Sequence, residues 1–270
     1  MKDKDMKEGI SMQEISGVDN VSFTHIVPEN DKDSAVTVEN NLKKVKENIN
    51  LACREAGRGT GDVKLIAVSK IKPVSLVERA VKAGQLEFGE NKPQELKEKK
   101  EIFGGNSDVK WHMIGSLQKN KVKYVVGNAV LIHSVDSYDL ACEIDRVSFK
   151  KGMVSNILIE INIADEPSKS GIAKEEALNL VSRISSDLKS VHVCGLMCIA
   201  PETDDPESSR KYFVQMRKIA IDIKEKSIDN VSMDELSMGM SSDYRVAIEE
   251  GATLVRVGTA IFGPRNYQKV

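Results

Sequence analysis

Apolar residues along the chain follow two alternating patterns. Short, mostly apolar runs are separated by longer segments in which apolar positions repeat every three or four residues. Runs of the first kind are typical of strands buried on both faces, and segments of the second kind are typical of helices with one buried face. The predicted strands are 64–70, 86–91, 111–115, 130–136, 156–163, 191–200, 234–240 and 254–263.

Helical spacing is clearest between these strands, at 76–81, 178–184 and 212–223. One more helix is predicted before the first strand, beginning at Thr37. Its apolar residues recur at steps of four and three and form one face. Gly57 follows this segment and is a suitable C-cap.

Strands that alternate with helices predict βαβ units and a parallel sheet. Eight such units connected by right-handed crossovers favour a closed (β/α)₈ TIM barrel over an open doubly wound sheet, which usually has fewer strands. We expect a single barrel domain over residues 37–270. Residues 1–36 mix charged, Gly, Ser and Asn residues, so we expect a mobile N-terminal extension.

Charge and composition narrow the function classes. The chain has 270 residues, with 39 basic and 41 acidic residues and a formal net charge of -2. This balance does not favour binding to nucleic acid or to an anionic membrane. No run approaches the roughly 20 apolar residues that span a bilayer, and the charged start of the chain does not resemble a secretory signal. We therefore expect neither nucleic acid nor membrane as a partner.

The four cysteines indicate a reducing compartment. Cys194 and Cys198 lie four apart on one predicted strand and are expected on the same face. Their Cα atoms would then be about 13 Å apart, too far for a disulfide or for a shared metal. No cluster of His, Cys, Asp and Glu has metal-ligand spacing, so no metal site is predicted. We expect reduced, structural cysteines and a cytoplasmic protein.

A lysine at the end of the first strand is the strongest candidate for chemistry. Barrel active sites lie at the carboxyl ends of the strands. Ile66, Val68 and Lys70 share one face of the predicted strand. If that face lines the barrel, partial burial lowers the lysine pKa, and a neutral amine can attack a carbonyl. The alternative is an ordinary surface lysine at a solvated strand end.

The loops after the last two strands resemble a phosphate site. Barrels commonly bind phosphate there. Ser241 and Ser242 precede a predicted helix and are expected to cap it, leaving N–H groups for an anion. Gly258 permits close approach of the backbone, and Thr259 adds a hydroxyl. An ordinary strand–turn–helix joint is the alternative, but together with Lys70 the loops favour a phosphorylated carbonyl compound. Pyridoxal 5'-phosphate (PLP) fits, as does a sugar phosphate in a Schiff-base aldolase.

Arg256 distinguishes between these ligands. It shares a strand face with Gly258 and points toward the predicted barrel interior, where a guanidinium needs an acceptor. It could pair with a core carboxylate such as Glu160. It could instead face the pyridine nitrogen of PLP, which would stay unprotonated because arginine does not give up its proton. Such a ring is a poorer electron sink.

Five blocks along the chain together resemble the pyridoxal phosphate homeostasis protein family. They are LIAVSKIKP, FGEN, WHMIGSLQKNK, GLMCIAP and LSMGMSSDYRVAIEEGATLVRVGTAIFG. The resemblance covers residues 38–267 and implies a single-domain barrel similar to the N-terminal domain of alanine racemase. The chain departs from the family pattern at Met113, at Lys92-Pro93 and in its extra N-terminal residues.

The resemblance implies a role for each candidate residue. Lys70 would form the internal aldimine with PLP, and Arg256 would face the ring nitrogen. The phosphate would be bound around Ser241, Gly258 and Thr259. Asn91, Met197 and Met240 would line the cofactor.

The same resemblance bears on catalysis. Alanine racemases use a tyrosine from a separate C-terminal domain, whereas this sequence ends seven residues after the last predicted strand. Tyr124, Tyr138 and Tyr244 fall near predicted helix starts. We therefore expect no catalytic residues and a monomeric carrier that supplies PLP to apo-enzymes or vitamin B6 salvage enzymes. The alternatives are a narrow-scope PLP-dependent racemase and a sugar-phosphate Schiff-base lyase.

Three further features are expected to be structural. His112 and His133 lie in or near apolar strands and are expected to be core or rim histidines. The run KEKKE at 97–101 is expected to be the solvated end of a helix.

Overall fold

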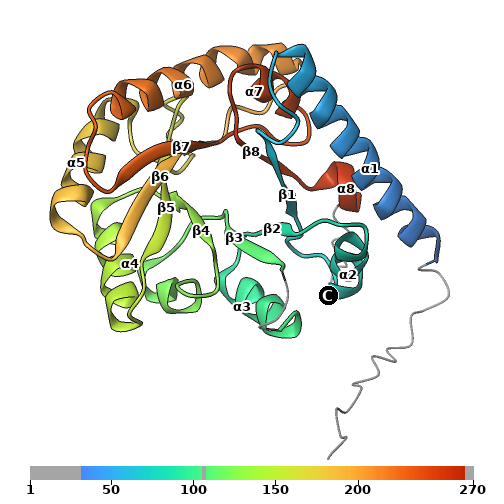
Figure 1. Cartoon of the computed structure of the whole chain (residues 1–270), viewed down its shortest axis with the longest axis horizontal. Coiled ribbons are helices and arrows are strands. Elements are labelled where there is room, and N and C mark those ends of the chain that lie inside the picture. The colour runs from blue at the N-terminus through green and yellow to red at the C-terminus, as the bar shows by residue number, and fades with distance from the viewer. Residues whose placement is uncertain (1–31, 105–107, 265–270) are drawn as a thin grey trace, which may run out of the picture.

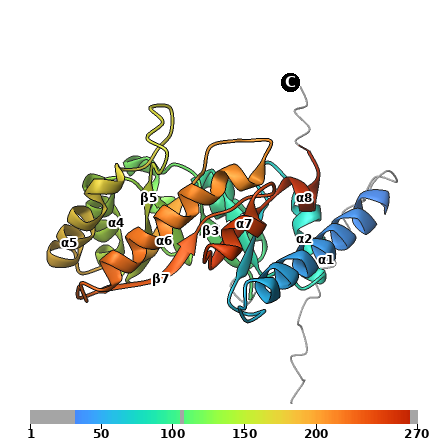
Figure 2. The same cartoon turned by 90° about the horizontal axis from the view of Figure 1, so that it is seen from above.

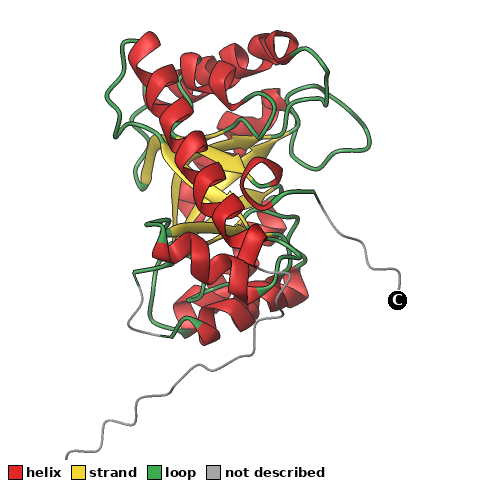
Figure 3. Cartoon of the chain, turned by 90° about the vertical axis from the view of Figure 1, so that its right-hand side faces the viewer, coloured by secondary structure: helices red, strands yellow, loops and turns green. Residues whose placement is uncertain are grey.

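A computed structural model describes residues 32–104 and 108–264 as one closed barrel (Figure 1). Eight parallel strands pair in chain order, from β1 to β8 and back to β1. Helices surround the strands on the outside (Figure 3). The strands are β1 (Lys64–Val68), β2 (Glu87–Glu90), β3 (Lys110–Met113), β4 (Leu131–Val135), β5 (Ser155–Ile161), β6 (Val191–Cys198), β7 (Val231–Ser237) and β8 (Leu254–Val257). The predicted (β/α)₈ barrel is confirmed.

The helices follow the strands in the order expected of a barrel. The α-helices are α1 (Lys32–Glu55), α2 (Val74–Lys82), α3 (Pro93–Ile102), α4 (Tyr138–Lys150), α5 (Ala177–Asp187), α6 (Arg210–Lys224), α7 (Tyr244–Glu249) and α8 (Thr259–Phe262). Short 3₁₀ helices are η2 (Lys119–Tyr124), η3 (Lys174–Glu176) and η4 (Pro206–Ser209). In the described ranges, no helix has both the length and the apolar character needed to cross a bilayer.

The strands separate two apolar layers. The larger layer lies between the strands and the surrounding helices, where the rings of Phe88 and Trp111 pack in a tilted arrangement with centroids 5.5 Å apart. The smaller layer fills the barrel interior and consists of Ile66, Leu131, Leu158, Met197 and Leu254. Alternate residues of each strand supply the two layers, which explains why the strands read as almost continuous apolar runs.

Two strand predictions differ from the structure at their ends. The last predicted strand, 254–263, divides into β8 and α8, because the chain turns at Gly258 and the amides of Ile261 and Phe262 donate to its carbonyl. A short apolar run does not distinguish a strand from a buried helix. β7 begins and ends three residues earlier than the predicted 234–240.

The two cysteines of β6 do not face the same side, contrary to the prediction. Pairing with β5 shifts between Val193 and Gly195, so Cys194 is an extra residue in the ladder. Cys194 therefore packs against the interior layer, whereas Cys198 belongs to the outer layer. A Cβ at Gly195 would overlap the Glu235 carbonyl, so this bulge requires glycine. All four cysteines are free, as expected.

Helix α1 covers the seam where the barrel closes (Figures 1 and 2). It contacts α2, α7 and α8, the helices next to the first and last strands. Its predicted apolar face is buried, and Asn41 donates to the Ile261 carbonyl at 3.2 Å. The helix begins at Lys32, five residues before the predicted start at Thr37. Residues 1–31 lie outside the described part, so the mobility expected of the extension stays a prediction.

Replacing Leu42 tests how much this helix stabilises the barrel. Leu42 is 1% exposed and lies in the α1 face. We expect Leu42→Ala to lower the free energy of unfolding by about 3 kcal/mol, because it leaves a cavity at the seam. Urea denaturation measures this. Lys43→Ala, at a 77% exposed neighbour, is the control and should change stability by less than about 0.5 kcal/mol. Equal effects would contradict the docking of α1.

Candidate functional site

A cavity of about 400 Å³ opens at the carboxyl ends of the strands. Its walls come from the loops after β1, β2, β7 and β8, as expected for a barrel active site. The lining residues are Val68, Lys70, Lys72, Asn91, Ile114, Ile199, Glu202, Met240, Ser241, Ser242, Arg256, Gly258, Thr259 and Gly263. All predicted site residues except Met197 are among them.

Met197 lies below this cavity. It is 1% exposed and packs in the interior layer with Ile66 and Leu158. The cofactor contact proposed for Met197 therefore stays a prediction.

Lys70 reaches the cavity because of the strand alternation predicted for β1. Ile66 lies in the barrel interior, and Val68 and Lys70 line the cavity above it. Lys70 follows the end of β1 by two residues and is half-buried. The lysine thus lies at a cavity wall, as the alternation predicts, and its chemical role stays a prediction.

A buried network fixes the backbone on both sides of Lys70. Lys99 of α3 donates to the Ser69 carbonyl at 2.7 Å and pairs with Glu90 at 2.8 Å. The Ser69 hydroxyl donates to Glu90 at 2.6 Å. Ile71 has a φ of 62°, and its amide donates to Glu95 at 2.7 Å. These contacts compensate a left-handed conformation that costs free energy for a β-branched residue.

Lys99 corrects the prediction for the KEKKE run. Lys99 is 4% exposed and ion-paired, so 97–101 is not uniformly solvated. Burial raises the pKa of the Glu90 carboxyl to about 7, although the ammonium of Lys99 opposes the shift. Sequence periodicity did not identify Lys99 as buried, because a run of charged residues gives no signal for which side chain faces inward.

The loops after β7 and β8 lie against each other at the cavity. The Gly258 amide donates to the Ser241 hydroxyl at 3.3 Å. A Cβ at Gly258 would lie 3.2 Å from Val68, so this position favours glycine because β1 approaches closely. The predicted serine cap of α7 is wrong. Asp243 precedes the helix, and its carboxylate accepts from the Met240 amide at 2.6 Å.

Arg256 extends from β8 into the cavity floor and is 4% exposed. Its guanidinium donates to the Ser237 hydroxyl at 2.6 Å and to the Cys198 carbonyl at 2.9 Å. No ion pair joins it to Glu160 within the described ranges, so the alternative of a core salt bridge is wrong. Glu160 Oε2 is buried without a hydrogen-bond partner. Burial and the negative charge of Asp136 raise the pKa of Glu160 to about 7.

Several lining residues were not predicted. Lys72 is one of them, and its ammonium donates to the carbonyls of Phe262, Gly263 and Pro264 at 2.8–3.1 Å. It therefore ties the end of the described chain to the loop after β1. Glu202 and Ile199 come from the loop after β6. The only sequence signal for a place at the cavity was that both residues lie near the end of a predicted strand. Met113 and Lys92-Pro93, the departures from the family pattern, do not line the cavity.

Among the residues that the structure describes, the cavity has neither a metal-ligand group nor a tyrosine. No group of three or more His, Cys, Asp or Glu residues in the part of the chain that the structure describes could bind a metal ion. Tyr138 donates to Asp187 and stacks on Arg183 instead of facing the cavity. Among the described lining residues there is no tyrosine, histidine or cysteine. The polar groups that face the cavity are thus amines, hydroxyls, an amide, a guanidinium and one exposed carboxylate.

Comparison with known proteins identifies the family. Residues 40–266 match the family model described as alanine racemase, N-terminal domain. The pyridoxal phosphate homeostasis protein of Aquifex aeolicus is 43% identical over 226 residues, which cover 84% of this chain and 97% of the relative. That of Escherichia coli K12 is 38% identical over 235 residues, covering 86% and 98%. The chain belongs to the pyridoxal phosphate homeostasis protein family.

Solved structures support the same grouping. PipY of Synechococcus elongatus PCC7942, described with PLP bound, superposes with a TM-score of 0.73 at 33% identity, covering 84% of this chain and all of PipY. An alanine racemase from Clostridium difficile 630 superposes with a TM-score of 0.66 at 15% identity, covering 86% of this chain and 58% of the racemase. At that identity the racemase shares the fold alone.

Removing Lys99 should destabilise the protein strongly. Lys99→Met leaves Glu90 as an unpaired buried carboxylate, and we expect a loss of about 3–5 kcal/mol at pH 8 in urea denaturation. The loss should shrink at pH 5, where Glu90, with its pKa of about 7, is protonated. Lys97→Met is the control, because Lys97 pairs with Glu101 at the surface. A loss independent of pH would argue against the buried ion pair.

Glu160 should destabilise the cofactor-free protein at high pH. Its folded pKa of about 7 exceeds the ordinary value, so stability is complete below about pH 4.5 and is lost as pH rises through 7. Glu160→Gln should therefore raise the unfolding free energy by about 1–3 kcal/mol at pH 8 and change it little at pH 5. Glu175→Gln, at an exposed side chain, should be neutral at both. Thermal denaturation at the two pH values decides this.

Proposed function

We propose that this protein binds PLP through Lys70 and acts in PLP homeostasis as a carrier without robust catalytic activity. The observation that carries the proposal is one cavity that contains Lys70, the loops after β7 and β8, and Arg256. Relatives of 38–43% identity are named pyridoxal phosphate homeostasis proteins, and PipY is described with PLP bound.

The lining groups match the three parts of PLP. The amine of Lys70 would condense with the aldehyde and release water, which leaves a Schiff base at the wall of the cavity. The hydroxyls of Ser241 and Thr259 and the backbone near Gly258 would bind the phosphate. Asn91 and Met240 would contact the ring.

Arg256 would face the ring nitrogen and favours a carrier over an enzyme. Because a guanidinium only donates, the ring nitrogen would accept and remain unprotonated. PLP acts as an electron sink most strongly when that nitrogen is protonated, so this arrangement suits cofactor binding better than carbanion chemistry. The burial of Arg256, with hydrogen bonds to Ser237 and to the Cys198 carbonyl, would keep the guanidinium oriented.

The cavity walls support the same conclusion. Two-base racemisation needs an acid or base on each face of the cofactor. The described walls offer no tyrosine or histidine, and Glu202, their one carboxylate, is exposed. We infer that Lys70 binds the cofactor without a catalytic partner on the opposite face.

The proposal extends to location and partners. Four free cysteines support a reducing compartment such as the cytoplasm. The Schiff base is reversible, so a monomeric carrier could deliver PLP to apo-enzymes or to vitamin B6 salvage enzymes while its aldehyde is masked.

Absorbance spectra of wild type and Lys70→Ala test the proposal. We expect PLP to give a visible band with the wild type, borohydride to fix the cofactor on Lys70, and peptide mass spectrometry to locate it. Lys70→Ala should lack the fixed product. Lys72→Ala should keep it, because Lys72 already donates to three carbonyls. A colourless wild type would end the proposal, and loss of α-deuterium from labelled amino acids would favour a racemase instead.

A further inference from the structure

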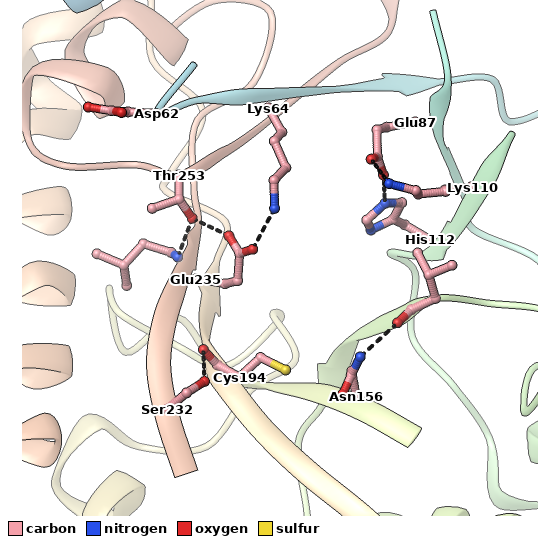
Figure 4. Close-up of polar contacts among 12 residues, drawn as sticks. Asp62, Lys64, Glu87, Lys110, His112, Asn156, Cys194, Ser232, Glu235 and Thr253 are labelled. Carbon is pink, nitrogen blue, oxygen red and sulfur yellow. Dashed lines mark hydrogen bonds and ion pairs between the residues drawn. The ribbon is translucent and has the colours of Figure 1, made fainter. Parts of the chain in front are cut away.

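The amino-terminal end of the barrel carries a second polar opening (Figure 4). The cavity around Lys70 lies at the carboxyl ends of the strands, at the other end of the barrel. We call it the N-terminal mouth and define it by Lys64, Glu87, Lys110, His112 and Glu235. Two ion pairs lie there in matching surroundings. Lys64 pairs with Glu235 at 2.8 Å, and Lys110 pairs with Glu87 at 3.1 Å. The two carboxylates are 21% and 19% exposed, so only their further contacts distinguish them.

Glu87 begins a chain of hydrogen bonds that crosses the barrel to Arg256. Its carboxylate contacts His112 Nε2 at 2.7 Å. His112 Nδ1 lies 2.9 Å from His133 Nε2, and His133 Nδ1 lies 2.8 Å from the Ser237 hydroxyl. That hydroxyl accepts from Arg256 at 2.6 Å. Glu235 does not enter this chain, because its second oxygen accepts from Thr253.

The donor and acceptor capacity of each group decides which partner donates every hydrogen bond along the chain, and we call this order of donors the direction of the chain. The Glu87 carboxylate only accepts, so a neutral His112 carries its proton on Nε2 and accepts at Nδ1; the Ser237 oxygen accepts from Arg256, and its single hydrogen is donated to His133 Nδ1. His133 then carries its proton on Nε2 and donates to His112 Nδ1. His112 carries its proton on Nε2 and donates to Glu87. Both histidines are neutral in this arrangement, and each link has one donor and one acceptor.

The surroundings of the two histidines favour the neutral chain. His133 is fully buried and His112 is 3% exposed. Burial, with the nearby His112 and Arg256, lowers the pKa of His133 well below its ordinary value. Although burial opposes the shift, hydrogen bonds from His112 and Lys110 lower the pKa of Glu87, so the acceptor at the end of the chain is charged.

One added proton would disrupt the direction of the chain. With His112 cationic, both of its ring nitrogens donate, and His133 must carry its proton on Nδ1 instead. Ser237 then receives donors from both His133 and Arg256, and its own hydrogen has no acceptor in the chain. The other titratable or charged groups near the chain are Lys64, Lys110, Cys194 and Glu235 at the mouth, and Glu160, Cys198 and Asp243 near Arg256.

We propose that Glu87, His112, His133 and Ser237 are positioning residues that orient the Arg256 guanidinium toward the cofactor, so that protonation at the N-terminal mouth weakens PLP binding at the opposite end of the barrel. The cofactor part of this inference rests on the proposed function, in which Arg256 contacts the ring nitrogen. The direction of the chain rests only on the contacts between the protein's own residues.

Nitrogen-15 NMR of histidine-labelled, cofactor-free protein tests the direction. Long-range proton–nitrogen spectra distinguish the two tautomers of a neutral ring. We expect His112 and His133 both to carry the proton on Nε2 at pH 8. His25→Gln and His192→Gln variants remove the signals of the two other histidines and so assign the pair. A proton on Nδ1 of either chain histidine at pH 8 would overturn the direction.

PLP titrations of Glu87→Gln and Glu235→Gln test the effect on the cofactor. A glutamine at 87 can donate to His112 as well as accept, so the chain loses its single direction, whereas Glu235→Gln alters only the matched ion pair. We expect Glu87→Gln to raise the PLP dissociation constant about threefold to tenfold at pH 8, the effect of about one hydrogen bond. The ratio to wild type should be smaller at about pH 5.5 than at pH 8, because an added proton disrupts the wild-type chain as well. Glu235→Gln should stay near wild type at both pH values.

The outcomes distinguish failure of the positioning role from failure of the proposed function. If wild type binds PLP and both variants bind it equally well at both pH values, the positioning role is wrong and the proposed function stands. If wild type does not bind PLP, the proposed function fails, and with it the cofactor role of the chain. Equal melting temperatures of the two variants check that Glu87→Gln does not act through unfolding.

Discussion

The closure of β8 onto β1 is the constraint on which the site depends. Leu65 pairs with Val255 and Ala67 with Val257, so the first and last strands run side by side although almost the whole barrel sequence separates them. This pairing brings Lys70, just beyond β1, beside Gly258, just beyond β8. The close approach of Val68 to Gly258 joins the two strand ends, and α1 covers the same seam from outside. Without closure, the amine of Lys70 and the loops after β7 and β8 would not share a cavity.

Two buried polar systems lie behind Lys70 and Arg256. Lys99 and Glu90 fix the backbone around Lys70 from the helix side, and the histidine chain reaches Arg256 through the barrel interior. Buried charges are costly unless they are paired, and both systems are joined by short hydrogen bonds. Glu90 and Glu160 each still have one buried carboxylate oxygen without a hydrogen-bond partner. Both systems therefore connect buried polar groups to residues that line the cavity or lie next to one that does, while the smaller interior layer is apolar.

The barrel itself does not decide between carrier and enzyme. An alanine racemase shares the fold at 15% identity, whereas PipY shares it at 33% identity over its full length. Function depends on the groups that line the cavity, not on the architecture that positions them. Here the lining combines the amines of Lys70 and Lys72 and hydroxyl-bearing loops with a guanidinium that only donates. That set is suited to binding an aldehyde and a phosphate, and it lacks an obvious second acid or base among the described residues.

The sequence by itself determined the order of the eight strands and the inward face of β1. Alternation along 64–70 correctly predicted that Ile66, Val68 and Lys70 point inward, and the turn residues after β7 and β8 marked the loops at the cavity. Strand ends and partners required the tertiary structure. Lys99 is one of several lysines in a charged run, and only the position of α3 against β1 and β2 buries it. Met197 and Cys194 depend on a bulge that periodicity does not reveal. His112 and His133 became a directed chain only when β3, β4, β7 and β8 closed around one interior, because a hydrogen-bond partner distant in sequence leaves no local pattern.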